Sequence, residues 1–166
     1  MPGGKTLVGV ISDTHGLLRP EAVAALKGAD LIIHAGDVGT PQVLDGLRKL
    51  APTFVVRGNI DKAHWAEALP ATAAVEVGGL LFYVLHDISE LDLDPAAVGY
   101  AAVVYGHSHQ PSIETREGVL FLNPGSAGPR RFRLPVGLAR LDLCQTPWQP
   151  EFIPFDLNQL RANRRG

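Results

Sequence analysis

Five segments in the first third of the chain alternate between two hydrophobic patterns, and this order constrains the fold more than any other feature. Short apolar runs rich in β-branched residues occur at 7–11, 30–34 and 53–56, as is typical of strands covered on both faces. The segments between them begin at Pro20 and Pro41 and space their apolar residues as amphipathic helices do. The order β-α-β-α-β predicts parallel strands joined by right-handed crossovers, with helices on the faces of the sheet.

Proline, glycine and threonine mark the ends of these two predicted helices. Pro20 and Pro41 suit the first helical turn, because a residue there needs no backbone N–H. Gly28 is expected to close the first helix. Thr40 is expected to cap the second helix, and Pro52 to end it.

The second half of the chain shows strand patterns without comparable helices. Turns at 78–79 and 117–118 join apolar runs into two predicted hairpins, and a polar or helical stretch lies around 91–98. Most pairings in this half are expected to be antiparallel, so we predict an α/β fold of two packed sheets with outer helices. The strands expected here cover 73–77, 80–85, 101–104, 112–116, 119–122, 136–143 and 151–155.

Length and composition favour a single globular domain. The chain has 166 residues, of which 46% are hydrophobic and 19% are charged, and this balance supports a substantial core. We expect one domain over residues 1–166, with a core of about 6–156. The charged C-terminal segment, 158–166, is expected to fray or to form a short surface helix.

Charge, cysteine content and the length of the apolar runs restrict the compartments and partners that we expect for this protein. The formal net charge of −2, without a basic stripe of interleaved aromatics, argues against a nucleic-acid-coating protein. Cys144 is the only cysteine, so no intramolecular disulfide forms. The chain starts without a signal-peptide pattern, and its apolar runs are too short to cross a membrane. We therefore expect a cytoplasmic protein without a membrane segment.

Candidate metal ligands follow several predicted strands at their carboxyl ends. In open α/β sheets, ligands bind in the crevice outside those ends. Nitrogen and oxygen donors without thiolate suit Mn, Fe, Zn, Ni or Co. A lone histidine pair such as His107 and His109 is equally consistent with a polar loop, but several strand ends here carry donors. The seven candidate ligands are Asp13, His15, Asp37, Asn59, His86, His107 and His109.

The number of candidate ligands predicts a centre of two metal ions. Seven donors are too many for one four-coordinate ion, and the two oxygens of Asp37 could bridge two ions. Two divalent cations would bring four positive charges, of which the aspartates cancel two, while Asn59 adds none. The remaining positive charge attracts phosphoryl oxygens and lowers the pKa of a bound water. We therefore predict phosphoester hydrolysis, with Asp37, Asn59 and His107 as the catalytic residues acting through that water.

These residues occur in motifs that resemble those of the calcineurin-like metallophosphoesterase superfamily, in particular its small single-domain phosphodiesterases. The resemblance covers roughly residues 7–143 and extends to the retromer subunit of the same fold. The matching motifs are Asp13-Thr14-His15, Gly36-Asp37, Gly58-Asn59-Ile60-Asp61, His86, Gly106-His107-Ser108-His109 and Asn123-Pro124-Gly125-Ser126.

The resemblance implies a four-layer α/β/β/α sandwich with two mixed sheets and a dinuclear metal centre. The expected cofactors are two divalent ions, with Mn²⁺ as the first choice and Ni, Zn, Fe, Co or Mg as alternatives. Carried over by motif, one ion would be held by Asp13, His15, Asp37 and His109, and the other by Asp37, Asn59, His86 and His107.

Two positions depart from the family pattern. Many members have a histidine at the position of Ile60, where it assists the phosphoryl oxygen or the leaving group, and isoleucine transfers no proton. His86 is followed by Asp87-Ile88, where glycine and a second histidine are frequent. These departures predict slower turnover, or protonation of the leaving group by water.

Other polar residues near the motifs are expected to support the centre rather than to bind metal. His34 and Asp61 are predicted to orient the ligands, since metal ligands need hydrogen-bonded partners. Guanidinium groups match phosphate geometry, and His64 is the spare histidine that could act as an acid. The predicted supporting or phosphate-contacting residues are His34, Arg57, Asp61, Ser126 and Arg130, with Arg131 and Arg133 as further phosphate candidates.

Two functions of different classes are consistent with these motifs. The first is hydrolysis of a small-molecule phosphodiester, with phosphomonoester or nucleic-acid cleavage as variants. The second is a protein-interaction scaffold that retains a catalytically weak metal site. A large exposed apolar patch would favour the scaffold, whereas a basic open cleft over two metals would favour the enzyme. The sequence also leaves a homo-oligomer open.

Overall fold

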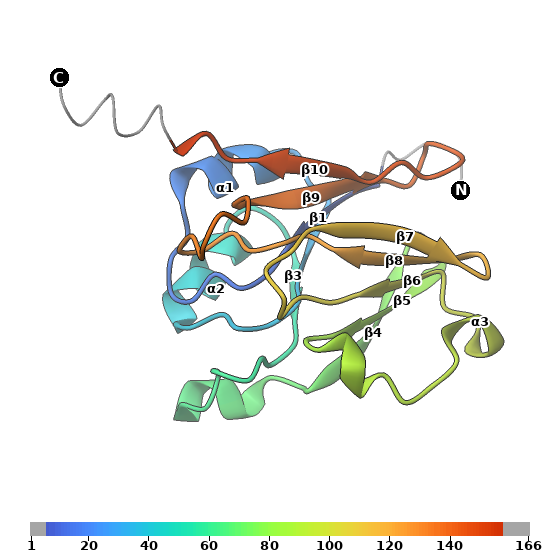
Figure 1. Cartoon of the computed structure of the whole chain (residues 1–166), viewed down its shortest axis with the longest axis horizontal. Coiled ribbons are helices and arrows are strands. Elements are labelled where there is room, and N and C mark those ends of the chain that lie inside the picture. Colours follow the sequence, from blue (N-terminus) through green and yellow to red (C-terminus); the bar gives the residue numbers. More distant parts are fainter. Residues whose placement is uncertain (1–5, 158–166) are drawn as a thin grey trace, which may run out of the picture.

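The first sheet contains the three strands predicted at the start of the chain. In this computed structural model, which describes residues 6–157, the strands are β1 Leu7–Ile11, β2 Leu31–His34, β3 Thr53–Val55, β9 Gly137–Asp142 and β10 Glu151–Pro154. They pair in the order β10-β9-β1-β2-β3 (Figure 1). β1, β2 and β3 are parallel, as the β-α-β-α-β pattern predicted, whereas β9 and β10 extend the sheet by antiparallel pairing.

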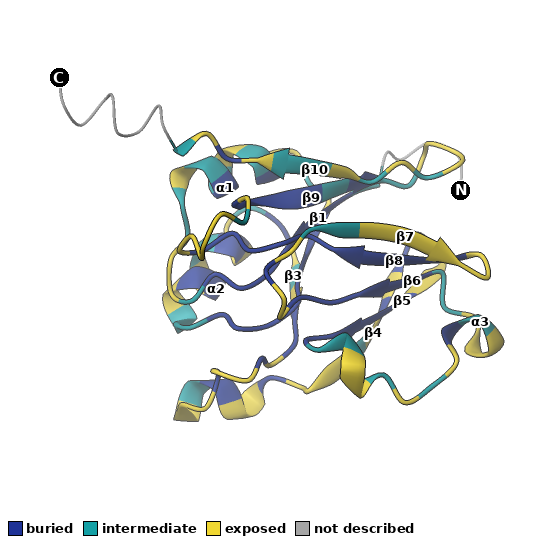
Figure 2. Cartoon of the chain, in the orientation of Figure 1, coloured by how far each residue is buried: buried dark blue, intermediate teal, exposed yellow. Residues whose placement is uncertain are grey.

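The second sheet is formed by the middle of the chain. Its strands are β4 Thr72–Val77, β5 Leu80–Leu85, β6 Ala102–Val104, β7 Ser112–Arg116 and β8 Val119–Asn123, in the order β4-β5-β6-β8-β7. Both predicted hairpins are present, but β5, β6 and β8 are parallel to one another. β8 is buried throughout and the edge strand β7 is mostly exposed (Figure 2).

The helices are short, and each follows one strand and precedes another in the sequence. They are α1 Pro20–Leu26, α2 Pro41–Arg48 and α3 Pro95–Val98, with the 3-10 helices η1 His64–Ala68 and η2 Ile88–Glu90. Prolines begin all three α-helices, as predicted for α1 and α2. Thr40 stands at the N-cap of α2, but its side chain makes no capping hydrogen bond. The expected hydroxyl cap was therefore wrong, and the fixed φ of Pro41 provides the helical start instead.

Three apolar clusters show that the molecule has four layers. Buried residues of both sheets, such as Val10 and Phe82, form the central cluster. A second cluster joins the outer face of the first sheet to α1 and α2, through residues such as Leu26 and Leu47. The third covers the outer face of the second sheet with η2 and α3. The predicted α/β/β/α sandwich of two mixed sheets is confirmed.

Alternation along β1 explains how one strand serves two of these clusters. Val8 and Val10 face the second sheet, whereas Ile11 belongs to the cluster under the helices. Gly9 lies between them on the helix side, where an added Cβ would overlap the side chain of Leu26. Glycine at this position therefore lets α1 lie close to the sheet.

The carboxyl ends of β1, β2, β3, β5 and β6 meet along one edge of the sandwich, and the predicted metal ligands follow them. Both sheets contribute to this edge, on the left of the view in Figure 1. No helix in the described part of the chain combines the length and the apolar character needed to cross a membrane. The predicted charged segment 158–166 lies outside the described residues, so its structure and the single-domain extent of 1–166 stay predictions.

Candidate metal centre

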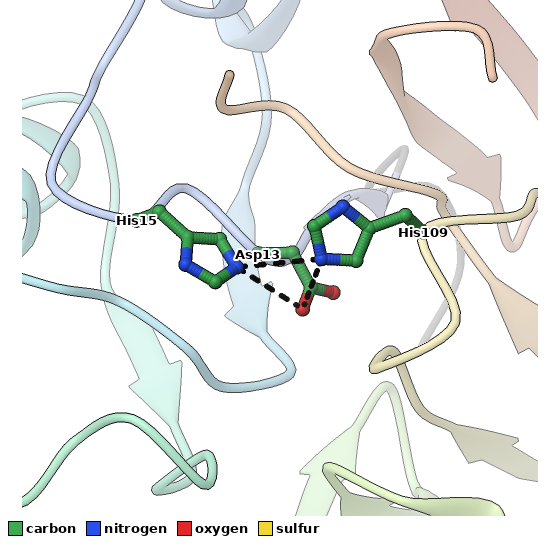
Figure 3. Close-up of side chains that lie close together, drawn as sticks. All are labelled: Asp13, His15 and His109. Carbon is green, nitrogen blue, oxygen red and sulfur yellow. Dashed lines mark hydrogen bonds and ion pairs between the residues drawn. The ribbon is translucent and has the colours of Figure 1, made fainter. Parts of the chain in front are cut away.

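Asp13, His15 and His109 form the first group of converging donors (Figure 3). The Nε2 atoms of the two histidines are 3.3 Å apart. Asp13 Oδ1 lies 3.4 Å from His109 Nε2 and 3.8 Å from His15 Nε2. All three donor atoms lie close enough together to share one ion.

His86, Asn59 and His107 form the second group. Asn59 Oδ1 lies 3.1 Å from His86 Nε2 and 3.2 Å from His107 Nδ1. His86 is buried, whereas Asn59 and His107 are exposed. This half of the centre therefore opens to solvent, as a site for an incoming substrate requires.

Asp37 lies between the two groups. Its Oδ2 atom is 3.6 Å from His15 Nε2 and 3.2 Å from His86 Nε2. Asp13 Oδ1 also approaches His86 Nε2, at 3.8 Å, so each aspartate has an oxygen near both groups. The shorter distance to His86 makes Asp37 the better bridging candidate.

Each aspartate uses one carboxylate oxygen for the protein and leaves the other for the centre. Asp13 Oδ2 accepts hydrogen bonds from the Ser12 hydroxyl (2.7 Å) and the His107 backbone N–H (3.1 Å). Asp37 Oδ1 accepts from the Ile60 backbone N–H at 3.1 Å. Asp13 Oδ1 is buried without any hydrogen bond. A buried carboxylate oxygen of this kind is costly unless a proton or a cation approaches it.

The tautomer of His86 adds a second sign that a cation fits here. His86 Nδ1 lies 2.7 Å from the backbone oxygen of Ala35, so Nδ1 carries the proton and donates it. Nε2 of the neutral ring then presents a lone pair to oxygens of Asp37 and Asn59. The Asn59 amide can present either end: its NH2 would donate to these acceptors, and its oxygen would bind a cation. The donor set therefore fits a divalent ion.

Electrostatics within the cluster agree with this geometry. Burial raises the pKa of Asp13, but the neighbouring His109 and His15 outweigh burial and hold that pKa well below its usual range. Burial lowers the pKa of His86, but Asp37 and Asp13 raise it more. The aspartates are thus ionised and His86 attracts a proton, which a bound metal ion would displace.

Five of the candidate ligands have left-handed backbone conformations. The φ angles are 55° at Asp13, 47° at His15, 55° at Asp37, 73° at His107 and 62° at His109. Such conformations cost about 1–3 kcal/mol each for residues other than glycine, and they concentrate at functional sites. The loops after β1, β2 and β6 therefore hold these side chains in place at a cost in backbone strain.

Two motif glycines are required because there is no room for a side chain. A Cβ at Gly58 would overlap the backbone nitrogen and Oδ1 of Asp37. A Cβ at Gly106 would overlap the Ser12 hydroxyl and approach Asp13 Oδ2. These glycines let the loops of different strands approach each other closely.

Asp61 connects the loops after β2 and β3. Its carboxylate accepts hydrogen bonds from the backbone N–H groups of Val38 (3.1 Å), Gly39 (3.0 Å) and Gly58 (2.9 Å). It is therefore placed to fix Asp37 and Asn59 through the backbone beside them, as a supporting residue would be.

His34 is enclosed by the same loops. Its Nδ1 accepts from the Gly36 N–H at 3.1 Å, and its Nε2 lies 3.0 Å from the Thr14 hydroxyl. That hydroxyl donates to Val38 O at 2.8 Å, so His34 donates to Thr14. Burial lowers the pKa of His34 to about 4, despite the nearby Asp13 and Asp61. Both ring nitrogens are used, which leaves none for a metal ion.

The segment after β8 supports the centre from the other sheet. Ser126 Oγ donates to the backbone oxygen of Asp13 at 3.0 Å. The Asn123 side-chain NH2 donates to Gly106 O (3.1 Å) and lies 3.0 Å from the Ser108 hydroxyl. This support by Asn123 and the contacts made by Ser12 and Thr14 were not predicted in detail. Their position inside or beside the motifs was the available signal.

Arg57, Arg130 and His64 make the contacts that the structure describes with residues other than the candidate ligands. The Arg57 guanidinium donates to the backbone oxygen of Leu69 at 3.3 Å. Arg130 lines a shallow cavity with Pro154 and Phe155. His64 is exposed and pairs with Glu67 at 3.2 Å. Their roles toward phosphate stay predictions, as does that of Arg131 and Arg133, which are exposed.

Comparison with known proteins points to the same family that the motifs resemble. Residues 7–146 match the calcineurin-like phosphoesterase superfamily domain. A probable metallophosphoesterase of Methanothermobacter thermautotrophicus is 36% identical over 149 residues, covering 82% of this chain and 86% of the relative. A fold of two mixed sheets with this arrangement of donors defines a metal-dependent phosphoesterase class. The chain belongs to the calcineurin-like phosphoesterase superfamily.

Two further similarities are more distant. A phosphodiesterase of Methanocaldococcus jannaschii is 27% identical over 137 residues, covering 71% of this chain and 82% of the relative. The structure of Vps29 complexed with Zn²⁺ from Entamoeba histolytica has a TM-score of 0.67 and 22% identity, covering 91% of this chain and all of that one. The second similarity shows a shared fold.

Proposed function

We propose that this chain hydrolyses phosphodiesters at a centre of two divalent metal ions. The observation that carries the proposal is a cluster in which carboxylate oxygens and imidazole nitrogens from different loops converge closely enough to share an ion. Asp13 Oδ1, which has no hydrogen-bond partner, and Asp37 Oδ2 lie 3.8 Å and 3.2 Å from His86 Nε2. Ionised carboxylates held this close to a ring nitrogen require a positive charge among them, which a proton on His86 supplies in the metal-free protein and a bound cation would replace.

The donors divide between two ions around Asp37. Asp37 Oδ2 approaches one histidine from each group, which supports a bridging role for it. One ion would be held by Asp13, His15, Asp37 and His109, and the other by Asp37, Asn59, His86 and His107. Mn²⁺ is the proposed native metal because oxygen and imidazole donors suit it.

The bound ions would supply a positive clamp for the phosphoryl oxygens and an activated water. The chain's own residues place these ions and keep the excess positive charge. Asn59 contributes a neutral oxygen at the exposed side of the centre, so the charge there is not cancelled. His107 is beside it and 47% of its side chain is exposed, which leaves that face open to a diester.

Ile60 occupies the position at which many members of the family carry a histidine that assists the leaving group, and isoleucine transfers no proton. The backbone N–H of Ile60 donates to Asp37 Oδ1, and its side chain is 42% exposed. Burial raises the pKa of Asp87, but hydrogen bonds from Ser89 together with nearby His107 hold that pKa below its usual value, so Asp87 is ionised at neutral pH. We therefore propose diesters whose leaving group departs as an anion, such as aryl diesters, as the preferred small-molecule substrates.

The similarity to known proteins supports phosphodiester over phosphomonoester hydrolysis. The relative from Methanocaldococcus jannaschii is a phosphodiesterase, and it matches over 137 residues, covering 71% of this chain. With a single cysteine the chain needs no oxidising compartment, and we place its activity in the cytoplasm.

The test is hydrolysis of bis(4-nitrophenyl) phosphate by metal-free protein to which Mn²⁺ is returned. We expect activity that depends on Mn²⁺ and that is lost in Asp37→Ala and His107→Ala. Asp92→Ala is the matched control for Asp37→Ala, because Asp92 is exposed and has no predicted role in the centre. Equal rates in the wild type and in both variants would contradict the proposal.

Metal binding without turnover, for any divalent ion and any diester tested, would favour the scaffold function instead. The exposed apolar residues that a scaffold could use, such as Phe54, Val98 and Ile113, are distributed over β3, α3 and β7. No specific observation in the described residues selects one such surface as an interface.

A further inference from the structure

His107 presents its two ring nitrogens to different partners. Nδ1 lies 3.2 Å from Asn59 Oδ1 at the candidate centre. Nε2 lies 3.7 Å from Asp87 Oδ2. A neutral imidazole that binds a metal ion through one nitrogen carries its proton on the other. The proton of a metal-binding His107 would therefore point toward Asp87.

Asp87 is held in this place by Ser89. Asp87 Oδ1 accepts hydrogen bonds from the backbone N–H (3.0 Å) and the hydroxyl (2.8 Å) of Ser89, at the start of η2. Oδ2 is left for His107. The Gly106 N–H also donates to His86 O at 2.9 Å, so the loops that carry the two partners are tied together.

We propose that Asp87 is a positioning residue for His107, which fixes the tautomer that leaves Nδ1 free for the metal ion shared with Asn59 and His86. This inference rests on the proposed two-metal centre. A carboxylate on the far nitrogen of a ligating histidine fixes the ring and raises its basicity, and its loss typically costs about 10–100-fold in metal affinity.

A weaker role would leave metal binding unchanged. The side chains of His107 and Asp87 are 47% and 28% exposed, and ion pairs exposed to this degree contribute little to stability. A cap on η2 would stabilise only that short helix. Neither effect would lower the affinity for one ion and leave the affinity for the other unchanged. The separate affinities for the two ions are therefore the decisive measurement.

The first test is calorimetric titration of metal-free protein with Mn²⁺. Asp87→Asn removes the charge but keeps an acceptor for Ser89. We expect one binding step to weaken about 10–100-fold while the other step keeps its affinity. Asp92→Asn, with the same charge change at an exposed position of the same connecting segment, should leave both steps unchanged. Unchanged binding in Asp87→Asn, or equal weakening of both steps, would overturn the inference.

Two further measurements guard against a folding artefact. Ser89→Ala keeps the charge but removes one tether, so its loss of affinity should lie between those of Asp92→Asn and Asp87→Asn. Long-range ¹H–¹⁵N NMR of the metal-free protein should show the Nε2–H tautomer of His107 in the wild type and a mixture in Asp87→Asn. The same tautomer population in both would contradict the role of Asp87. A wild type that binds no second ion would instead contradict the proposed two-metal function, and the NMR result would still decide whether Asp87 sets the tautomer.

Discussion

The two sheets contribute different chemistry to the same edge of the molecule. Loops of the first sheet provide both carboxylates, the amide and one imidazole, from Asp13, His15, Asp37 and Asn59. Loops of the second sheet provide imidazoles alone, from His86, His107 and His109. Because neither sheet carries a complete set, the candidate centre exists only where the two sheets pack together. Metal binding and sheet packing should therefore stabilise each other.

Direct contacts between the sheets already prepare this arrangement. The His107 N–H donates to Asp13 Oδ2, and His86 Nδ1 donates to Ala35 O. Ser126 reaches the backbone of Asp13. The first sheet thus supplies negative charge at fixed positions, and the second sheet brings the neutral ligands to it. The following experiments test this division, beginning with the largest expected effect.

Removing the carboxylate between the two groups should have the largest effect. Asp37→Ala takes away the oxygen that approaches both His15 and His86, so the affinity for both ions should decrease. We expect activity on an aryl diester to fall by more than the roughly 100-fold that loss of an outer partner costs. Steady-state kinetics at saturating Mn²⁺, with metal content measured in parallel, tests this. Retention of both ions by the variant would show that Asp37 does not bridge them.

Substitution of each of the two histidines in the Gly106–His109 segment should remove a different metal ion. His107→Ala should deplete the ion proposed to bind Asn59 and His86, and His109→Ala the ion proposed to bind Asp13 and His15. Anomalous scattering from crystals of each variant locates the remaining metal. Loss of the same ion from both variants would show that the proposed assignment is wrong.

Removal of metal should loosen the contact between the sheets. A ligand present at 100 times its dissociation constant adds about 2.7 kcal/mol to the free energy of unfolding. For a chain of this size, that corresponds to roughly 5–10 °C in melting temperature per ion. Calorimetric melting with and without a chelator measures the change. In Asp37→Ala the chelator should have much less effect.

His34 should make the metal-free protein less stable in acid. Its pKa is about 4 in the folded chain, against an ordinary value of 6.5. Between these values the unfolded chain binds a proton that the folded chain excludes. The stabilisation is complete above pH 6.5 and decreases as the pH falls toward 4, by about 3 kcal/mol. Urea unfolding at pH 7 and 4.5 should show a smaller decrease in His34→Gln, which retains a donor for Thr14.

The smallest effect is expected at the support from the second sheet. Ser126→Ala removes the hydrogen bond to the backbone oxygen of Asp13 but no proposed ligand. The free energy of unfolding should decrease by about 1 kcal/mol, with both metals still bound. Urea unfolding of the metal-loaded protein tests the stability. A variant that loses one ion completely would show that Ser126 has a larger role than support.

The sequence alone determined the elements of the first sheet and the residue types at its edge. Local signals were sufficient there, because buried parallel strands, amphipathic helices and glycine-containing motifs each have their own pattern. The parallel pairing of β6 with β5 and β8 was not anticipated from local patterns. Turn patterns predict only antiparallel pairing between strands that are adjacent in the sequence. β6 instead pairs in parallel with β5 and β8, and longer segments connect it to both.

Only the tertiary structure decided how the donors face one another. Sequence motifs named Asp13 and Asp37, but the packed loops decided which oxygen of each faces the centre. The contact of Asp87 with His107 joins segments that follow two different strands, so no local pattern predicts it. Left-handed backbone at the ligand residues is likewise imposed by neighbouring loops rather than by residue type. The sequence thus determined which groups are present, and non-local packing determined their orientation.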